Sequence, residues 1–131
     1  VLLAAGLLPV LGQGRGGFLV NVTSGLALAP KRQAPVYCAS KAALRNVTRT
    51  LRYQAQDAGL PVLVSDCVMA LTETAMTCGR GRGKITPMVA AAALLDGVKR
   101  DQPEIWVGQM QLLRILYRFS PVLVARILRN G

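Results

Sequence analysis

Three short apolar runs, separated by longer helical segments, constrain the fold of this chain more than any other feature. The runs cover residues 18–24, 61–68 and 105–108. Each is short enough for a strand, and the first two are mostly apolar, which is typical of buried strands. Strands that alternate with helices predict parallel neighbours joined by right-handed crossovers. The sequence therefore predicts an α/β fold with a doubly wound parallel sheet of about three strands and flanking helices.

Helical patterns fill the segments between these runs. We expect helices up to about residue 11, over 36–58, over 88–98, and from 112 onward on both sides of Pro121. Gly59 and Pro61 end the long central helix, and Pro87 begins the next. Residues 12–17 match the letters G-x-G-x-x-G, but they follow a helix and precede a strand. The dinucleotide fingerprint has the opposite order, so we predict a flexible turn there and no phosphate site.

Tyr37, Lys41 and Ser24 form the most specific chemical signal in the sequence. Tyr37 and Lys41 are four residues apart in a predicted helix, which places their side chains on one face. An ammonium near a phenol lowers the pKa of the phenol, so the tyrosine can exchange a proton near neutral pH. Ser24 ends the strand at 18–24, and open α/β sheets do their chemistry at that carboxyl edge. A Tyr-x-x-x-Lys pair alone is usually accidental, but the added serine and the strand-then-helix context indicate redox chemistry.

Residues 21–25 read Asn-Val-Thr-Ser-Gly, and residues 37–41 read Tyr-Cys-Ala-Ser-Lys. In these two segments the chain resembles the serine-bearing strand end and the tyrosine helix of the short-chain dehydrogenase/reductase family. The resemblance implies a Rossmann-like domain and an NAD(P)-dependent enzyme that transfers hydride between a nicotinamide and a small carbonyl or alcohol substrate. It also implies that Tyr37 is the general acid/base, that Lys41 binds the nicotinamide ribose, and that Ser24 hydrogen-bonds the substrate carbonyl.

A third segment, residues 69–76, is similar to the family's Pro-Gly-x-x-x-Thr stretch after the next strand. The resemblance implies cofactor contacts from Ala70, Leu71 and Thr74, with the threonine touching the nicotinamide amide. Met69 and Ala70 stand where the family has proline and glycine, and glycine allows a closer approach of the backbone. The glycine- and arginine-rich residues 79–84 have two readings, a mobile segment over the substrate or a solvated basic loop.

The resemblance covers residues 1–131, but it corresponds only to the catalytic, C-terminal half of the family's domain. Family members begin with a strand, a glycine-rich turn and a helix that together hold the cofactor pyrophosphate. None of these precedes Val1. We therefore expect a partial domain that lacks the cofactor-binding half, is inactive alone, and does not reveal whether NAD or NADP is used. Some family members dimerise through the first helix seen here and the tyrosine helix, so a homo-oligomer is expected for the complete protein.

Residue counts exclude several kinds of chemistry. The chain has no histidine, which rules out Ser-His-Asp and Cys-His catalysis and removes the commonest zinc ligand, so no metal site is expected. Its three cysteines, Cys38, Cys67 and Cys78, are odd in number and form no C-x-x-C pair. They are predicted to be free thiols in a reducing, cytoplasmic setting, with Cys38 acting as a small buried hydrophobe.

A net charge of +10 supports an alternative of a different class. No acidic residue follows Glu104, and arginines punctuate the apolar positions of residues 112–131. In this alternative the chain is a basic, peripheral membrane-surface or interaction protein that keeps the fold without catalysis, and the tail lies on anionic lipid. The commoner alternative is a helix whose apolar side packs on the sheet and whose arginines are solvated. Nucleic-acid binding is not expected, because aromatic residues are few and no known module motif is present.

Arg45, Arg49 and Arg52 recur at helical spacing along the tyrosine helix. Such a basic stripe is expected to be a solvated face or an oligomer contact.

Overall fold

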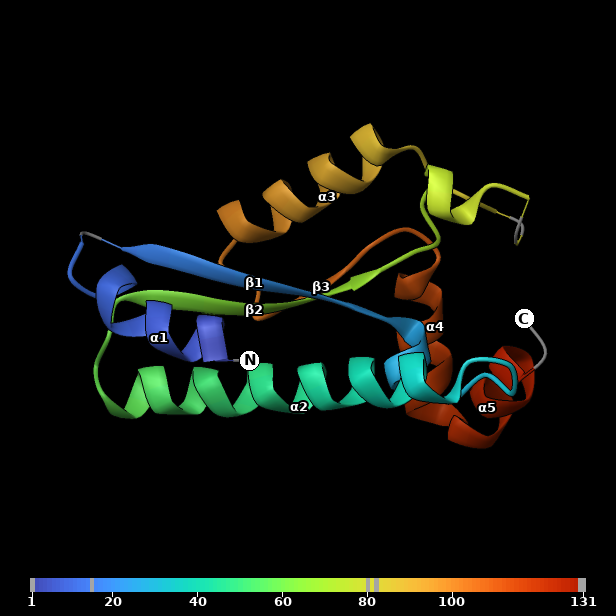
Figure 1. Cartoon of the computed structure of the whole chain (residues 1–131), viewed down its shortest axis with the longest axis horizontal. Coiled ribbons are helices and arrows are strands. Elements are labelled where there is room, and N and C mark those ends of the chain that lie inside the picture. Colours follow the sequence, from blue (N-terminus) through green and yellow to red (C-terminus); the bar gives the residue numbers. More distant parts are fainter. Residues whose placement is uncertain (1, 15, 80, 82, 130–131) are drawn as a thin grey trace.

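The computed structural model describes residues 2–14, 16–79, 81 and 83–129. The helices and strands in chain order are α1 (Leu2–Leu11), β1 (Gly17–Ser24), α2 (Pro35–Asp57), β2 (Val62–Met69), α3 (Pro87–Lys99), β3 (Glu104–Trp106), α4 (Met110–Phe119) and α5 (Pro121–Arg129), with 3-10 turns η1 (Gly25–Ala27) and η2 (Ala75–Thr77) (Figure 1). Each helix and strand expected from the sequence is present, with ends that differ by a few residues.

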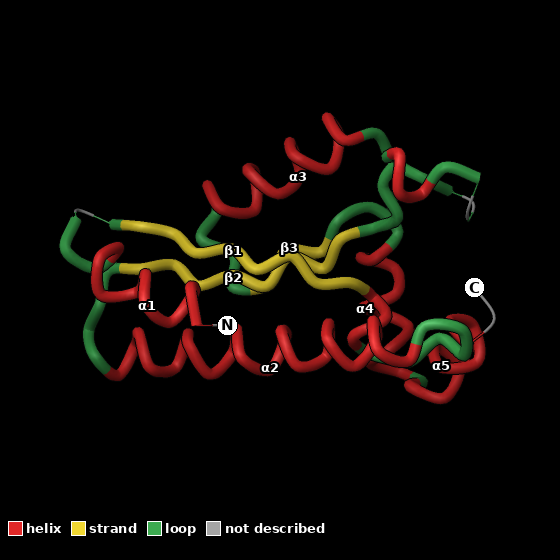
Figure 2. Tube along the Cα trace, in the orientation of Figure 1, coloured by secondary structure: helices red, strands yellow, loops and turns green. Residues whose placement is uncertain are grey.

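The three strands form one parallel sheet in the order β1-β2-β3. Helices α1 and α2 cover one face and α3 covers the other, so the sheet is doubly wound (Figure 2). In the register, Gly17 of β1 is opposite Val62 of β2, and Ser24 is opposite Met69. The carboxyl ends of β1 and β2 therefore lie together at one edge, and the architecture is a partial Rossmann-like fold.

The two crossovers have opposite hands, which corrects the expectation of right-handed crossovers throughout. Because the strands are parallel and run in the order β1-β2-β3, two crossovers of the same hand would place α2 and α3 on the same face. They lie on opposite faces (Figure 1). The long segment between β2 and α3, which carries η2 and the bridge from Thr72 to Ile85, takes the chain to the other face before α3 begins.

Alternating side chains divide the core between the two faces of the sheet. Leu19 and Val64 join the cluster under α1 and α2, whereas Val20 and Cys67 join the cluster under α3. Strand β1 has the apolar pattern of a buried strand, but it is an edge strand whose Phe18 is 54% exposed. An open edge at this strand was expected for a partial domain, because the pattern reports the apolar character of a strand and not the number of its neighbours.

The C-terminal helices build a separate small core. Leu113 of α4 and Val124 of α5 are buried with Ala29, which lies in the loop between β1 and α2. Gly25, the first residue after β1, has no room for a side chain, since a Cβ there would lie 2.7 Å from the Met110 Sδ. The apolar side of the tail therefore packs on the loop that joins Ser24 to Tyr37.

Candidate active site at the carboxyl edge of the sheet

Ser24 lies at the last position of β1, where the strand turns into η1. Its Oγ accepts a hydrogen bond from the backbone N–H of Leu26 at 3.2 Å and so caps η1. An extended residue followed by a tight turn is a typical capping geometry for serine. The structure thus places Ser24 at the carboxyl edge, as the sequence predicted, with a hydroxyl that already serves as an acceptor.

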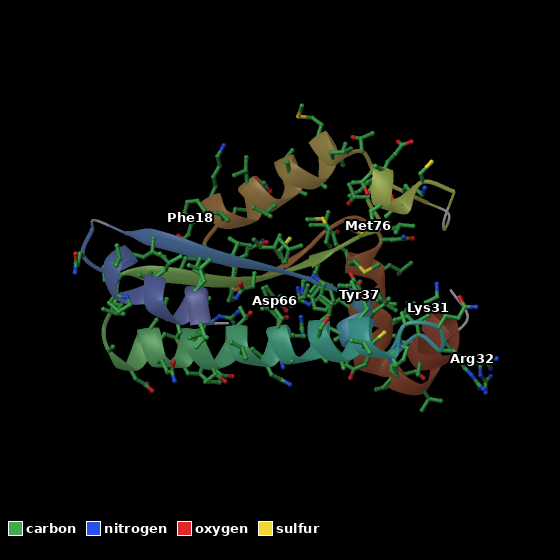
Figure 3. All side chains as sticks on the ribbon, viewed as in Figure 1. Phe18, Lys31, Arg32, Tyr37, Asp66 and Met76 are labelled. Atoms are coloured by element: carbon green, nitrogen blue, oxygen red, sulfur yellow. The ribbon has the colours of Figure 1, made fainter. Side chains whose placement is uncertain are left out.

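Tyr37 and Lys41 lie in the first turns of α2, which Pro35 begins. The Lys41 Nζ is 5.6 Å from the centre of the Tyr37 ring and donates a hydrogen bond to the Val22 carbonyl at 2.9 Å. Val22 is two residues before Ser24 in β1. The lysine therefore joins the start of α2 to the end of β1, and it brings the Tyr37 side chain, which is 46% exposed, to that same edge (Figure 3).

The predicted cofactor segment follows β2 at this edge. Ala70 comes directly after β2 and is buried, and the Leu71 carbonyl accepts a hydrogen bond from the Ile85 N–H at 3.0 Å. Thr74 is exposed and caps η2, where its N–H donates to the Thr77 Oγ1 at 3.0 Å. Because Met69 pairs with Ser24, this segment begins beside the serine.

A buried ionic network lies directly beneath the site. Arg45 of α2 forms ion pairs with Asp66 of β2 and with Glu104 of β3, and Arg49 shares the Glu104 carboxylate at 2.9 Å. The Thr23 hydroxyl donates to Asp66 at 2.5 Å. Asp66 lies between the sheet and α2 (Figure 3) and is fully buried.

The sequence predicted that the basic stripe on α2 is a solvated face or an oligomer contact. This prediction was wrong, because the stripe faces the sheet. Arg45 is 6% exposed, and Arg52 donates to the carbonyls of Val64 and Pro103. The arginines point to the sheet because the acidic side chains of Asp66 and Glu104 and backbone carbonyls that accept their N–H groups lie there. A signal was present in the sequence: Asp66 interrupts an apolar strand, and a buried aspartate needs a partner.

This network joins the elements that carry the predicted catalytic residues. Thr23 precedes Ser24 in β1, and Arg45 follows Lys41 by one turn of α2. Both side chains bind Asp66, so β1 and α2 are held to β2 through one carboxylate. Sequence reasoning missed Thr23, Arg45 and Asp66 as supports of the site.

Burial and charge shift the pKa values of three groups near the network. Burial raises the pKa of Asp66 more than the Thr23 hydrogen bond and the Arg45 charge lower it. Burial also raises the pKa of Glu104, but the hydrogen bond from Arg49 and the charges of Arg45 and Arg49 outweigh it, so this pKa is lowered. Burial raises the pKa of the Cys67 thiol to about 11, so Cys67 is a protonated, inert core residue near neutral pH.

The remaining cysteines and the basic loop make contacts within the chain that suggest no chemistry. Cys38 is buried, as expected, and its sulfur accepts a hydrogen bond from the Lys31 N–H, and all three cysteines are free. The Lys84 ammonium folds back onto the Thr77 carbonyl at 2.5 Å. Arg80 and Arg82, on which both readings of the loop depended, lie outside the described residues.

Two kinds of feature are absent from the described part of the chain. It contains no group of three acidic or cysteine side chains that could hold a metal ion. No helix in it combines the length and the apolar character that crossing a membrane requires.

Comparisons with known proteins find relatives of this chain in sequence and in fold. The family model described as short chain dehydrogenase matches residues 1–84. An uncharacterized oxidoreductase from Bacillus subtilis, DltE, is 34% identical over 103 residues, which cover 73% of this chain and 40% of that protein. A short chain dehydrogenase from Burkholderia cenocepacia, solved in complex with NADP, has the same fold, with a TM-score of 0.82 and 24% identity.

That alignment covers 94% of this chain and 51% of the Burkholderia protein. The chain thus spans about half of the solved structure and less of the curated relative. Since the family model covers the serine strand, the tyrosine helix and the segment after β2, this chain belongs to the short-chain dehydrogenase family.

Proposed function

We propose that residues 1–131 form the catalytic half of an NAD(P)-dependent oxidoreductase that acts on a small carbonyl or alcohol. The observation that carries the proposal is the Lys41 bridge, which joins the start of α2 to the end of β1. Through it, Ser24, Tyr37 and Lys41 belong to one edge of one sheet. An exposed phenol beside an ammonium and a hydroxyl suits proton transfer to or from a polarised carbonyl.

In this proposal each residue has one task. Ser24 donates its hydroxyl hydrogen to the substrate oxygen and polarises the carbonyl. Tyr37 gives a proton to that oxygen in reduction and removes it in oxidation, while the Lys41 ammonium stabilises the phenolate that forms. The nicotinamide, when bound, supplies or accepts the hydride at the substrate carbon.

The donor set at this edge fits a nicotinamide nucleoside. Lys41 and Tyr37 offer N–H and O–H donors to ribose hydroxyls, and Thr74 is exposed and offers its hydroxyl to the carboxamide. The backbone at Ala70 and Leu71 would form the wall beside the ring. The choice between NAD and NADP belongs to residues that would lie in the other half of the domain, which would also hold the pyrophosphate.

The setting of the complete protein is part of the proposal. Three free cysteines suit a reducing, cytoplasmic compartment. Leu2, Leu3 and Val10 of α1 are exposed apolar side chains, and Val36 at the start of α2 is 81% exposed. These residues would form the contact of a homo-oligomer through α1 and α2.

The test is Tyr37→Phe in a complete domain that contains this half, assayed by nicotinamide absorbance with a panel of aldehydes and ketones. The variant should lose turnover by at least about a hundredfold, because only the proton donor is removed. Tyr53→Phe, on the same helix, is the matched control and should keep turnover. Full activity of Tyr37→Phe, or equal loss in both variants, would reject the assignment. The isolated 131-residue chain should bind NADPH weakly and show no turnover, and tight binding would contradict the half-domain proposal.

A second candidate, attachment to an anionic membrane surface, is favoured by one observation on the tail. Ile115 and Phe119 of α4 and Val122 and Ile127 of α5 are exposed, and arginines lie between them. Such a mixture suits an interfacial helix. Co-sedimentation with anionic vesicles that neutral vesicles do not reproduce would support it, and equal recovery from both would reject it.

A further inference from the structure

Arginine side chains line two adjoining cavities that extend from the ionic network beneath the catalytic edge towards α4. The cavities have volumes of about 320 and 1160 Å³ and lie between α2, β3 and α4. Together they are lined by Arg45, Arg49, Arg52, Arg114 and Arg118. Glu104 is the only acidic residue in either lining. These residues are named the arginine groove below.

The positive charge in the arginine groove exceeds the negative charge that faces it. Arg45 and Arg49 share one oxygen of Glu104, at 3.0 and 2.9 Å. Arg52 donates only to backbone carbonyls, and no ion pair forms at Arg114 or Arg118 within the described residues. Three guanidinium groups therefore line the groove without a carboxylate partner, and their combined positive field attracts an anion.

Trp106 adds a second feature, a buried N–H group that is incompletely satisfied. Its side chain lines both cavities and is 8% exposed, and the guanidinium groups of Arg45 and Arg114 lie 5.1 and 5.7 Å from its ring centre. The indole N–H is buried and has no partner in full hydrogen-bond geometry among the described residues, although it lies close enough to the Glu104 carboxylate to help lower the pKa of that group. Because Arg45 and Arg49 also share this carboxylate, the N–H is only partly satisfied, and a ligand oxygen would complete it.

We propose that the arginine groove binds a small molecule that carries a multiply charged oxyanion of the phosphate class. The planar guanidinium groups match phosphate oxygens in pairs, and three uncompensated charges favour a dianion over a simple carboxylate. Ile115 and Phe119 line the larger cavity and would accept an apolar part of the same molecule.

The residues that set the groove apart lie away from the predicted catalytic residues and beyond the stretch that the family model matches. Strand β3 lies at the opposite side of the sheet from β1, which carries Ser24. Trp106, Arg114 and Arg118 follow residue 84, where the family match ends. The proposed ligand is therefore additional to the nicotinamide cofactor, and its binding does not depend on catalysis.

Isothermal titration of the 131-residue chain with pyrophosphate tests the proposal. The groove variant combines Arg114→Gln with Arg118→Gln, and the control combines Arg126→Gln with Arg129→Gln on α5. Both lose the same charge from the same tail, but only the first pair lines the cavities. The groove variant should bind pyrophosphate about a hundredfold more weakly, roughly tenfold for each arginine, and the control less than about threefold more weakly.

Circular dichroism of both variants should match the parent chain, since the exchanged side chains are exposed. No measurable pyrophosphate binding by the parent chain, or equal weakening in the two variants, would overturn the proposal. Phosphatidylglycerol vesicles then identify the source of the phosphate. Vesicle binding that only the groove variant loses supports a lipid headgroup, and vesicle binding that it keeps supports a soluble phosphate compound in the groove.

Discussion

At the scale of single residues, Arg45 is the buried centre of the ionic network. Its guanidinium neutralises Asp66, which has no contact with water, and part of Glu104. Removing one partner of a buried ion pair leaves the other charged and unpaired, which costs more than the pair itself contributes. The residue therefore links stability to the position of the catalytic helix.

Arg45→Met should lower the free energy of unfolding by about 3–5 kcal/mol near neutral pH, measured by urea denaturation. Without Arg45, the pKa of Asp66 should rise further above its unfolded value. A carboxyl whose folded pKa is raised stabilises the protein fully below its unfolded pKa and loses that contribution as pH rises through the folded pKa. The gap between Arg45→Met and the parent chain should therefore widen from pH 4 to pH 7.

Arg100→Met is the matched control for this prediction. Arg100 pairs with Asp96 one turn away on α3, and both side chains are largely exposed. Such surface pairs contribute little, so the control should change stability by less than about 0.5 kcal/mol. A loss from Arg45→Met no greater than that of the control would show that the network is not a source of stability.

The contacts of a side chain could be predicted from the sequence only where its partner is a few residues away along the chain. The pairing of Tyr37 with Lys41 follows from helical spacing alone, and the structure keeps the two together. The partners of Arg45 lie 21 and 59 residues away along the chain. No periodicity reports contacts at such separations, which is why the same helix face was read as solvated.

At the scale of elements, the packing of α3 on β3 depends on one glycine. A Cβ at Gly97 would lie 2.6 Å from the Ile105 Cγ1, and Ile105 is buried in β3. Gly6 of α1 is also inside a helix, but nothing lies within 4 Å of its Cβ position. The two glycines therefore differ only in the space around them.

Gly97→Ala and Gly6→Ala should change stability in opposite directions. Overpacking against Ile105 should cost about 1–3 kcal/mol, although alanine favours the helix. At Gly6 only the helix preference remains, so alanine should add roughly 0.5–1 kcal/mol. Both values follow from urea denaturation midpoints. A stabilising Gly97→Ala would mean that α3 does not pack on Ile105 as described.

Element positions were largely predictable because strands and helices differ in length and in their proline and glycine boundaries. The face on which each helix packs was not. Two right-handed crossovers would put α3 on the same face of the sheet as α2, but α3 lies on the opposite face, after the long connection that follows β2. A long connection weakens the rule, because the rule depends on a helix that returns directly to the sheet.

At the scale of the whole molecule, the sheet has an uncovered edge at β1. Strand β1 pairs only with β2, and no described strand lies on its other side. Its Phe18 and Val22 are exposed apolar side chains, and Phe18 lies on the outer strand of the sheet (Figure 3). An edge with free N–H and C=O groups beside apolar side chains is a template for pairing with another chain.

The 131-residue chain should therefore self-associate, with a mass by sedimentation equilibrium that rises with protein concentration. Phe18→Lys should shift the chain towards the monomer, because a charge on an edge strand opposes pairing with a second copy. Met88→Lys makes the same kind of change at the exposed start of α3, away from both β1 and the α1–α2 surface, and should leave the association unchanged. A monomer at all concentrations would show that the β1 edge does not pair, and dissociation by Met88→Lys alone would move the contact to α3. Association that Phe18→Lys weakens and Met88→Lys keeps would identify β1 as a contact between copies of the chain.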